Sequence, residues 1–253
     1  MLVMAHPARP WRSILRRQVL GAVPLLALGL APPNARAETV DLELILAIDA
    51  SASVSREEFF FQVHGLAKAF RDQAVAAAIE SLAPDGVAVA VVQWSAAEQR
   101  RLALEWSAIR DAAGAHALAA RLDTMPRYFA AGATAIGSAI DFATLLLAES
   151  PFAGRRQTID VSGDGSSNEG ILTVLARDRA GSAGITINGL AILNEEPDLD
   201  AYYLAKVIVG ADAFVMSAAG YEDFARAIRV KLVREIGGLP MVSLPAATAS
   251  LAP

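Results

Sequence analysis

Short apolar runs alternate with amphipathic segments along most of this 253-residue chain, and no other feature restricts its fold as strongly. The runs are nearly continuous in apolar residues, as in strands that are buried on both faces. The segments between them repeat apolar residues at helical spacing. Strands that alternate with helices are typical of an α/β domain, so we expect a doubly wound, mostly parallel sheet flanked by helices.

The pattern predicts where each strand and each helix lies in the sequence. Strands are expected over 43–48, 87–94, 157–162, 185–192 and 213–217, with 101–106 as a short edge strand. Helices are expected from Ser55, over 108–122, from Thr134, from 168 or 169 to about 181, over 198–209, and from Tyr221. In such a sheet, ligands bind beyond the carboxyl ends of the strands. The residues that follow each strand are therefore the first candidates for a functional site.

The strand expected over 43–48 ends abruptly in a polar sequence. Asp49 follows it, and Ser51 and Ser53 come at the next alternate positions. Small oxygen-bearing side chains at this spacing can point into one pocket, and hard oxygens suit a hard cation such as Mg²⁺. The serines could instead cap the helix that follows, where Ser55 and Glu58 have the spacing of a capping box.

Two distant segments could complete such a site. Thr134 lies in the sequence G-A-T-A-I, and Asp164 lies between two glycines in S-G-D-G, just after the strand expected over 157–162. Taken alone, the threonine could cap a helix and the aspartate could belong to a turn. Because Asp49 and Asp164 both follow strands of one parallel sheet, we expect them to meet at the same edge.

This set of residues resembles the metal-ion-dependent adhesion site (MIDAS) of von Willebrand factor A (VWA) domains. The residues that carry the resemblance are Asp49, Ser51 and Ser53 in D-A-S-A-S, Thr134, and Asp164. The resemblance covers about residues 40–237 and implies the Rossmann-like fold of that family. More narrowly, the chain resembles exported bacterial VWA-like proteins of a family of unknown function, DUF1194. One detail differs, since S-G-D-G stands where many relatives have T-D-G.

The resemblance implies a role for each of these residues. The hydroxyl oxygens of Ser51, Ser53 and Thr134 would bind a divalent cation directly, and Asp49 and Asp164 would bind it directly or through water. The cation would be Mg²⁺, with Mn²⁺ or Ca²⁺ as alternatives. Its open position would capture an Asp or Glu side chain of a partner protein. The domain would then be an adhesion-type binding module and not an enzyme.

A metal-dependent hydrolase or phosphoesterase on a similar sheet is the alternative function. Haloacid-dehalogenase-like enzymes also carry an aspartate at a strand end, but they need a second aspartate two residues later and a lysine. Here that position is Ser51, and no lysine lies near the site segments. The sequence also lacks a G-x-S-x-G elbow and a P-loop. A structural domain that does not use its metal site is a third hypothesis.

Several other residues near this edge have two interpretations each. Tyr128 and Phe129 lie in the loop before Thr134 and could line the partner site or fill the core. Trp94 ends a strand and is expected in the core. Residues 168–169 could start a helix or support the metal site. Residues 195–198 could be a solvated loop or a second cation site.

The first 37 residues are typical of an export signal. They carry five arginines and no acidic residue, then an apolar run, then A-x-A at its end. We expect cleavage after Ala37, with an uncleaved anchor as the alternative. Arg16-Arg17 also resembles a twin-arginine signal. The protein is therefore expected to be periplasmic or secreted, with one domain over 38–238 and a flexible tail over 239–253.

The composition narrows the class of partner. Residues 38–253 carry 17 basic and 27 acidic residues, a net charge near −10. This charge disfavours nucleic acids and anionic membranes as partners and is compatible with divalent cations. The sequence has no cysteine, which excludes thiolate metal sites. His64 and His116 lie in helical patterns, which argues against a zinc site rich in histidine.

Overall fold

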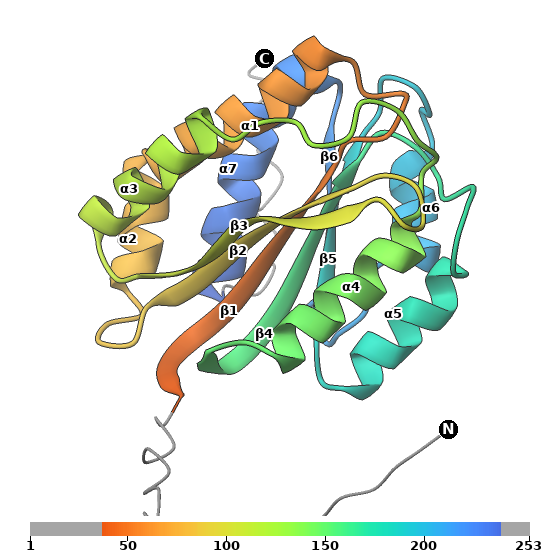
Figure 1. Ribbon diagram of the computed structural model, residues 1–253. Coiled ribbons are helices and arrows are strands. Elements are labelled where there is room, and N and C mark those ends of the chain that lie inside the picture. Colours follow the sequence, from red (N-terminus) through yellow and green to blue (C-terminus); the bar gives the residue numbers. More distant parts are fainter. Residues whose placement is uncertain (1–36, 239–253) are drawn as a thin grey trace, which may run out of the picture. The chain divides into compact units, whose positions relative to one another are not determined.

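The computed structural model describes residues 37–238, so the expected signal before Ala37 and the expected tail over 239–253 lie outside the described residues. Six strands form one sheet in the order β3-β2-β1-β4-β5-β6 (Figure 1). Neighbouring strands are parallel except β2 and β3, which are antiparallel. The strands are β1 Glu38–Asp49, β2 Val87–Trp94, β3 Arg100–Ile109, β4 Phe152–Gly163, β5 Thr186–Ile192 and β6 Val215–Ala218. The expected fold class is confirmed.

The direction in which the sheet is built reverses between β1 and β4. From β1 the chain moves outward to β2 and β3, and it then returns to the other side of β1 to form β4, β5 and β6. The crevice at such a point, beyond the carboxyl ends of the strands, is where doubly wound sheets bind ligands. Asp49 is the last residue of β1 and Asp164 directly follows β4. Both aspartates therefore lie at this switch point.

Helices cover both faces of the sheet (Figure 1). One face carries α1, α2, α3 and α7, and the other carries α4, α5 and α6. The helices are α1 Arg56–Phe70, α2 Gln73–Glu80, α3 Ala112–Asp123, α4 Ile136–Ala148, α5 Thr173–Ser182, α6 Leu199–Lys206 and α7 Tyr221–Gly237. None of these helices between residues 37 and 238 is both long and apolar enough to cross a bilayer.

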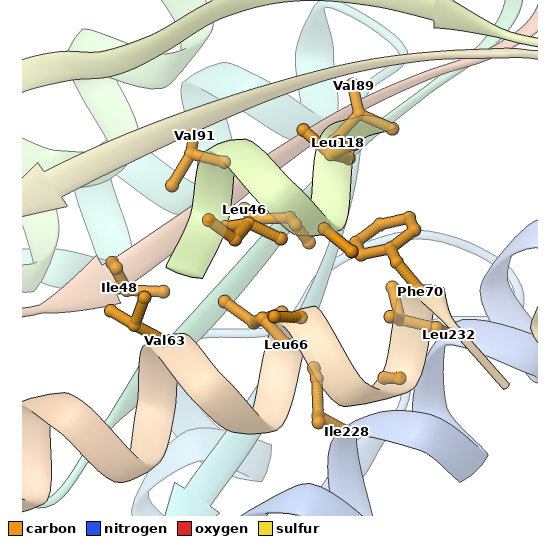
Figure 2. Close-up of a cluster of buried hydrophobic side chains, with 14 of the residues drawn as sticks. Leu46, Ile48, Val63, Leu66, Phe70, Val89, Val91, Leu118, Ile228 and Leu232 are labelled. Atoms are coloured by element: carbon orange, nitrogen blue, oxygen red, sulfur yellow. The ribbon is translucent and has the colours of Figure 1, made fainter. Parts of the chain in front are cut away.

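The strand β1 lies in the centre of the sheet and is covered by helices on both faces, which explains its apolar run Leu44–Ile48. Leu46 and Ile48 point to the face of α1 and α7, where they pack in one cluster with Leu66 (Figure 2). Ile45 and Ala47 point to the opposite face and belong to a second cluster. Each aliphatic side chain buried in this way contributes roughly 1.5–3 kcal/mol. After the apolar run Leu44–Ile48, the strand ends in the polar Asp49 at the switch point.

The start of α1 follows the prediction from sequence. The Ser55 hydroxyl accepts a hydrogen bond from the Glu58 amide at 3.2 Å, and the Glu58 carboxylate accepts one from the Ser55 amide at 2.7 Å. This reciprocal pair is a capping box. It fixes where the helix begins, and so it confines the serines of D-A-S-A-S to a short loop between β1 and α1.

Other predicted boundaries were wrong. The helix α5 begins at Thr173 and not at residues 168–169, because the preceding loop is held against α4 and turns at Gly170, whose φ is +78°. The helix α4 begins at Ile136, two residues after Thr134. The strand β3 is longer than 101–106 and includes the first two residues of the segment that was expected to be helical over 108–122. The short helix α2 was not predicted.

A buried charged cluster joins α7 to the sheet. Lys231 is fully buried, and its ammonium nitrogen lies 2.7 Å from Asp160 Oδ1 on β4 and also contacts Glu235 Oε1 one helical turn away. Asn188 Nδ2 on β5 donates a hydrogen bond of 2.8 Å to the same oxygen of Glu235. Burial, with the charge of Asp160 next, raises the pKa of Glu235 to about 8. The two carboxyl groups of this cluster thus share one internal cation.

Candidate metal centre

The end of β1 forms the first wall of the candidate site. The Asp49 side chain is fully buried, and its Oδ1 accepts a hydrogen bond of 2.7 Å from the Ser51 amide. The hydroxyls of Ser51 and Ser53 lie 3.1 Å apart. The carboxylate therefore folds the D-A-S-A-S loop back over itself, and both serine oxygens are brought to the side of the loop that carries Asp49.

The end of β4 supplies the second wall. Asp164 is buried, and its Oδ1 accepts a hydrogen bond of 2.8 Å from the Ser53 hydroxyl. Its Oδ2 accepts one of 3.0 Å from the hydroxyl of Tyr221, the first residue of α7. The structure thus joins two segments that are 111 residues apart in sequence. The sequence pattern placed Tyr221 only on a buried helix face, and nothing in its own surroundings in the sequence indicated a contact with Asp164.

Thr134 lies beside the same edge. Its hydroxyl is 4.0 Å from the position that a Cβ would have on Gly165, the residue after Asp164. The loop of Thr134 is also tied to the serine loop, because the Ala52 amide donates to the Gly132 carbonyl at 2.9 Å. All three segments predicted from sequence therefore meet at the carboxyl edge of the sheet.

Asn168 holds Thr134 in place. Asn168 Oδ1 accepts a hydrogen bond of 2.9 Å from the Thr134 amide, and the Asn168 amide donates one of 2.9 Å to the Thr134 carbonyl. The Ser167 hydroxyl donates to that carbonyl as well, at 3.1 Å. Of the two interpretations of residues 168–169, the geometry of Asn168 fits support of the site, and the helix start is wrong.

The two aspartates lie in an environment that disfavours their charges. Burial raises the pKa of Asp49 to about 7, with the charge of Asp164 as the next cause, and burial also raises the pKa of Asp164. Arg127 lies close by, but its guanidinium donates to the carbonyls of Ala50 and Ser51 at 3.1 and 2.9 Å, and not to either carboxylate. Among residues 37–238, no ion pair neutralises Asp49 or Asp164.

The donor set fits a hard divalent cation. Asp49 Oδ2 is buried and makes no hydrogen bond within the described residues. The remaining groups are hydroxyl and carboxylate oxygens, which Mg²⁺ prefers. Residues 37–238 contain no group of three or more His, Cys, Asp or Glu side chains suited to a metal, so this site would depend on its hydroxyls. A cation here would offset the cost of burying two carboxylates.

Gly163 is required where β4 reaches the site. A Cβ at this position would lie 2.9 Å from Asp49 Oδ2 and 2.9 Å from the hydroxyl of Tyr203. Contacts this short would push the Asp49 carboxylate out of place, because real side chains do not approach so closely. The glycine in S-G-D-G, where the sequence departs from the pattern of many relatives, therefore makes room for Asp49.

The other residues singled out in the sequence divide between core and surface. Trp94 is buried as predicted. Phe129 packs against the core under α1, whereas Tyr128 is at the surface beneath the guanidinium of Arg101, 4.1 Å from its ring centroid. Glu196 is not simply solvated, since its carboxylate accepts hydrogen bonds from the amide and the hydroxyl of Ser166.

Several solved structures resemble this one. Proximal thread matrix protein 1 from the mussel byssus, with a zinc-occupied MIDAS motif, is 15% identical over 78% of this chain and 48% of its own, with a TM-score of 0.53. The pilus adhesin SpaC from Lactobacillus rhamnosus GG is 13% identical over 78% and 30%, with a TM-score of 0.56. A von Willebrand factor type A protein from Catenulispora acidiphila is 21% identical over 79% and 43%, with a TM-score of 0.52. This chain thus spans less than half of each.

At these identities the structural likeness establishes the VWA-like fold and no more. No curated protein matches the chain in sequence. A family model described as a protein of unknown function, DUF1194, matches residues 39–240. This range contains the sheet except for the first residue of β1, all seven helices of the described domain and the five residues predicted to hold a metal. The chain is therefore a VWA-like protein that belongs to the DUF1194 family.

Proposed function

We propose that this protein is a metal-dependent binding module that captures an acidic side chain of a partner protein through a bound divalent cation. The observation that carries the proposal is the meeting of two buried carboxylates and three hydroxyl residues at the switch point, with no lysine, arginine or histidine among residues 37–238 in an ion pair with either carboxylate. The residues that would hold the cation are Asp49, Ser51, Ser53, Thr134 and Asp164.

The site is open on one side only. Asp49, Ser51 and Asp164 are buried, whereas Ser53 is exposed. A cation held by these groups could thus be reached from solvent past the serine loop. Mg²⁺ has six oxygen ligands and keeps several waters in protein sites. Because three of the five protein groups are neutral hydroxyls and the aspartates can bind through water, the ion would still attract an anionic ligand, and a partner carboxylate supplies one.

Mg²⁺ is the proposed cation, with Mn²⁺ or Ca²⁺ as alternatives. The zinc in the MIDAS motif of the mussel byssus protein supports a divalent ion on this fold. SpaC is a pilus adhesin, which supports an adhesive role for a domain of this fold. The order of charges in residues 1–37 supports export to the periplasm or beyond.

A metal-dependent hydrolase is the weaker alternative, because the two site aspartates would be occupied by the cation and neither Arg127 nor His64 is placed to act as a general acid or base. Arg127, the neighbouring cation, is engaged with backbone carbonyls. His64 lies on α1, where it stacks on Phe60 at 3.7 Å between ring centroids and lies beside Asp123 instead of the site aspartates. Acid–base catalysis needs a group within hydrogen-bond reach of the reacting atom.

The proposal is tested by metal titration and by capture. Chelator-treated full chain should bind one equivalent of Mg²⁺ in calorimetry, and Asp49→Ala should abolish this heat, whereas Asp178→Ala, an exposed aspartate on α5, should not. Proteins captured from envelope extract should then be retained with Mg²⁺, released by chelator and missed by Asp49→Ala. Full capture by Asp49→Ala, or unfolding on chelation, would show that the binding-module proposal is wrong.

A further inference from the structure

We propose that a pocket between α5 and α6 determines which acidic partner is accepted: it takes an aliphatic side chain next to the metal-bound Asp or Glu, and Lys206 pairs with a second carboxylate of the same extended segment. This inference rests on the proposed function and deepens it. The pocket, here the α5–α6 pocket, has a volume of about 410 Å³ and is lined by residues 167–174, Tyr202 and Lys206.

The α5–α6 pocket adjoins the segment that carries Thr134. Ser167 and Asn168 line it, and the same two residues hydrogen-bond to the backbone of Thr134. A segment bound at Thr134 therefore has the pocket as its immediate neighbour. In an extended chain, successive residues advance about 3.3 Å, so a side chain only a few residues from the metal-bound one can reach the pocket.

The wall of the pocket is rigid. A Cβ on Gly170 would lie 2.4 Å from the Ser138 hydroxyl, and a Cβ on Gly137 would lie 2.1 Å from the Ile171 carbonyl, so the loop is packed tightly on α4. The hydroxyl of Tyr202 accepts from the Ser167 amide at 3.3 Å and lies 3.2 Å from the Thr173 hydroxyl. A preformed pocket avoids part of the entropic cost of binding.

The rim of the pocket exposes aliphatic side chains without a local reason. Leu172 is 67% exposed and Ile171 is 38% exposed. Leu172 also occupies the N-cap of α5, where it provides no side-chain hydrogen bond. Ser, Thr, Asp and Asn are preferred there, and leucine forgoes the capping hydrogen bond that they would provide. A residue that is both badly placed for the helix and exposed is suited to contact a ligand.

The charges around the metal centre set the direction of the bound segment. Glu58, in the first turn of α1, accepts a hydrogen bond of 3.3 Å from Asn194 in the loop after β5, so the side of the site between these two segments carries a carboxylate that repels a second acid. Lys206 on α6 lines the pocket, and among residues 37–238 no carboxylate forms an ion pair with it, whereas Arg177 and Arg179 on α5 are both paired. Glu169 also lines the pocket, but its carboxylate accepts a hydrogen bond of 3.0 Å from the Ala97 amide. An acidic segment is therefore favoured toward Lys206.

A peptide selection tests this inference with the full chain. Phage-displayed random 12-residue peptides are selected on Mg²⁺-loaded protein and eluted with chelator. The selected sequences should share an acidic residue, an aliphatic residue and a second acidic residue within a short stretch. Leu172→Ser should weaken the best peptide about tenfold through lost apolar burial. Lys206→Glu should weaken it about fivefold or more, since a pair is replaced by repulsion.

Matched controls separate the pocket from the metal. Both substitutions should leave Mg²⁺ affinity unchanged and should not lower the melting temperature, which Leu172→Ser should raise slightly because serine can cap α5. Arg56→Glu, on the α1 side of the site, should leave peptide affinity unchanged. A peptide whose second acid is replaced by lysine should recover affinity for Lys206→Glu. If no peptide is eluted by chelator, the proposed function and this inference both fail. If peptides that chelator elutes bind the Leu172→Ser and Lys206→Glu variants as tightly as the wild type, the proposed function stands and this inference is wrong.

Discussion

Two pairs of buried acids lie along β4, and they are neutralised in different ways. Asp160 shares Lys231 with Glu235, so one cation of the protein serves both carboxyl groups. Asp164, where the strand has ended, meets Asp49, and among residues 37–238 no lysine or arginine pairs with either. The fold thus buries Lys231 beside Asp160 and Glu235, but among the described residues it places no such lysine beside Asp49 and Asp164. The second pair is therefore suited to a cation from solution, and the first is suited to hold α7 in place.

The largest expected effect comes from removing the internal cation. Lys231→Met should destabilise the protein by about 3–5 kcal/mol, because it leaves Asp160 and Glu235 buried without a partner charge. Urea denaturation measures this loss, and Lys206→Met, an exposed lysine, should change stability by no more than about 0.5 kcal/mol. A loss below about 1 kcal/mol for Lys231→Met would contradict the view that this pair depends on its lysine.

The second effect is the reverse case, in which the cation is added from outside. Mg²⁺ at a hundred times its Kd should stabilise the wild type by about 2.7 kcal/mol. Asp49→Asn should abolish this gain and yet be at least as stable as the wild type in chelator at pH 8, since it removes a buried charge. Thermal melting with and without Mg²⁺ measures both. A marked destabilisation of Asp49→Asn in chelator would show that the carboxylate is structural.

The third effect is a dependence on pH with a defined sign. The pKa of Asp49 is raised to about 7, so in chelator its contribution to stability is fully present at low pH and is lost as pH rises through about 7. Mg²⁺ needs the ionised carboxylate, so its affinity should fall by up to about tenfold per pH unit below 7.

The pH effect separates the two acid pairs. The pKa of Glu235 is raised to about 8, so its contribution to the stability of the protein is also lost as pH rises. Mg²⁺ should not change this contribution. In the wild type, the increase in melting temperature that Mg²⁺ causes should therefore become larger as the pH is raised from 6 to 8. A Mg²⁺ shift that is constant over this range would mean that Asp49 is not a ligand.

The smallest effects are expected from the neutral ligands. Ser53→Ala and Thr134→Val should each leave a folded domain and weaken Mg²⁺ binding by about tenfold, because each removes one uncharged oxygen. Ser182→Ala, at the far end of α5, is the matched control and should bind Mg²⁺ as the wild type does. Calorimetry ranks the variants, and an effect of Ser53→Ala that equals that of Asp49→Ala would contradict the expected difference between charged and neutral ligands.

The sequence predicted the parts of this molecule that depend on local patterns. The fold class followed from the alternation of apolar runs with helical segments. Asp49 and Asp164 could be placed at one edge because each follows a strand. The start of α1 was correct because Ser55 and Glu58 form the capping box within four residues. In each case the physical cause lies within one segment.

The remaining features depend on contacts between distant segments. Tyr221 reaches Asp164 across 57 residues, and Asn168 reaches Thr134 across 34. Lys231 is buried only because Asp160 on another element faces it. The loop before α5 was mistaken for a helix start because its packing on α4 overrides the local preference of Asn168 and Glu169 for a first helical turn. No periodicity in the sequence reports such pairings.

The position of β1 has a mechanical consequence for any force applied between its two ends. The strand is bonded on both sides along most of its length, to β4 from Glu38 to Ile48 and to β2 from Leu42 to Asp49. The candidate metal centre is at one end of this strand, and the chain enters the strand at the other. A pull between these two ends would run along the strand and across nearly all of its interstrand hydrogen bonds, which are slanted because both neighbouring strands are parallel to β1. The bonds would then be loaded together in shear instead of being opened one after another, and the centre of the sheet would resist the pull as a unit.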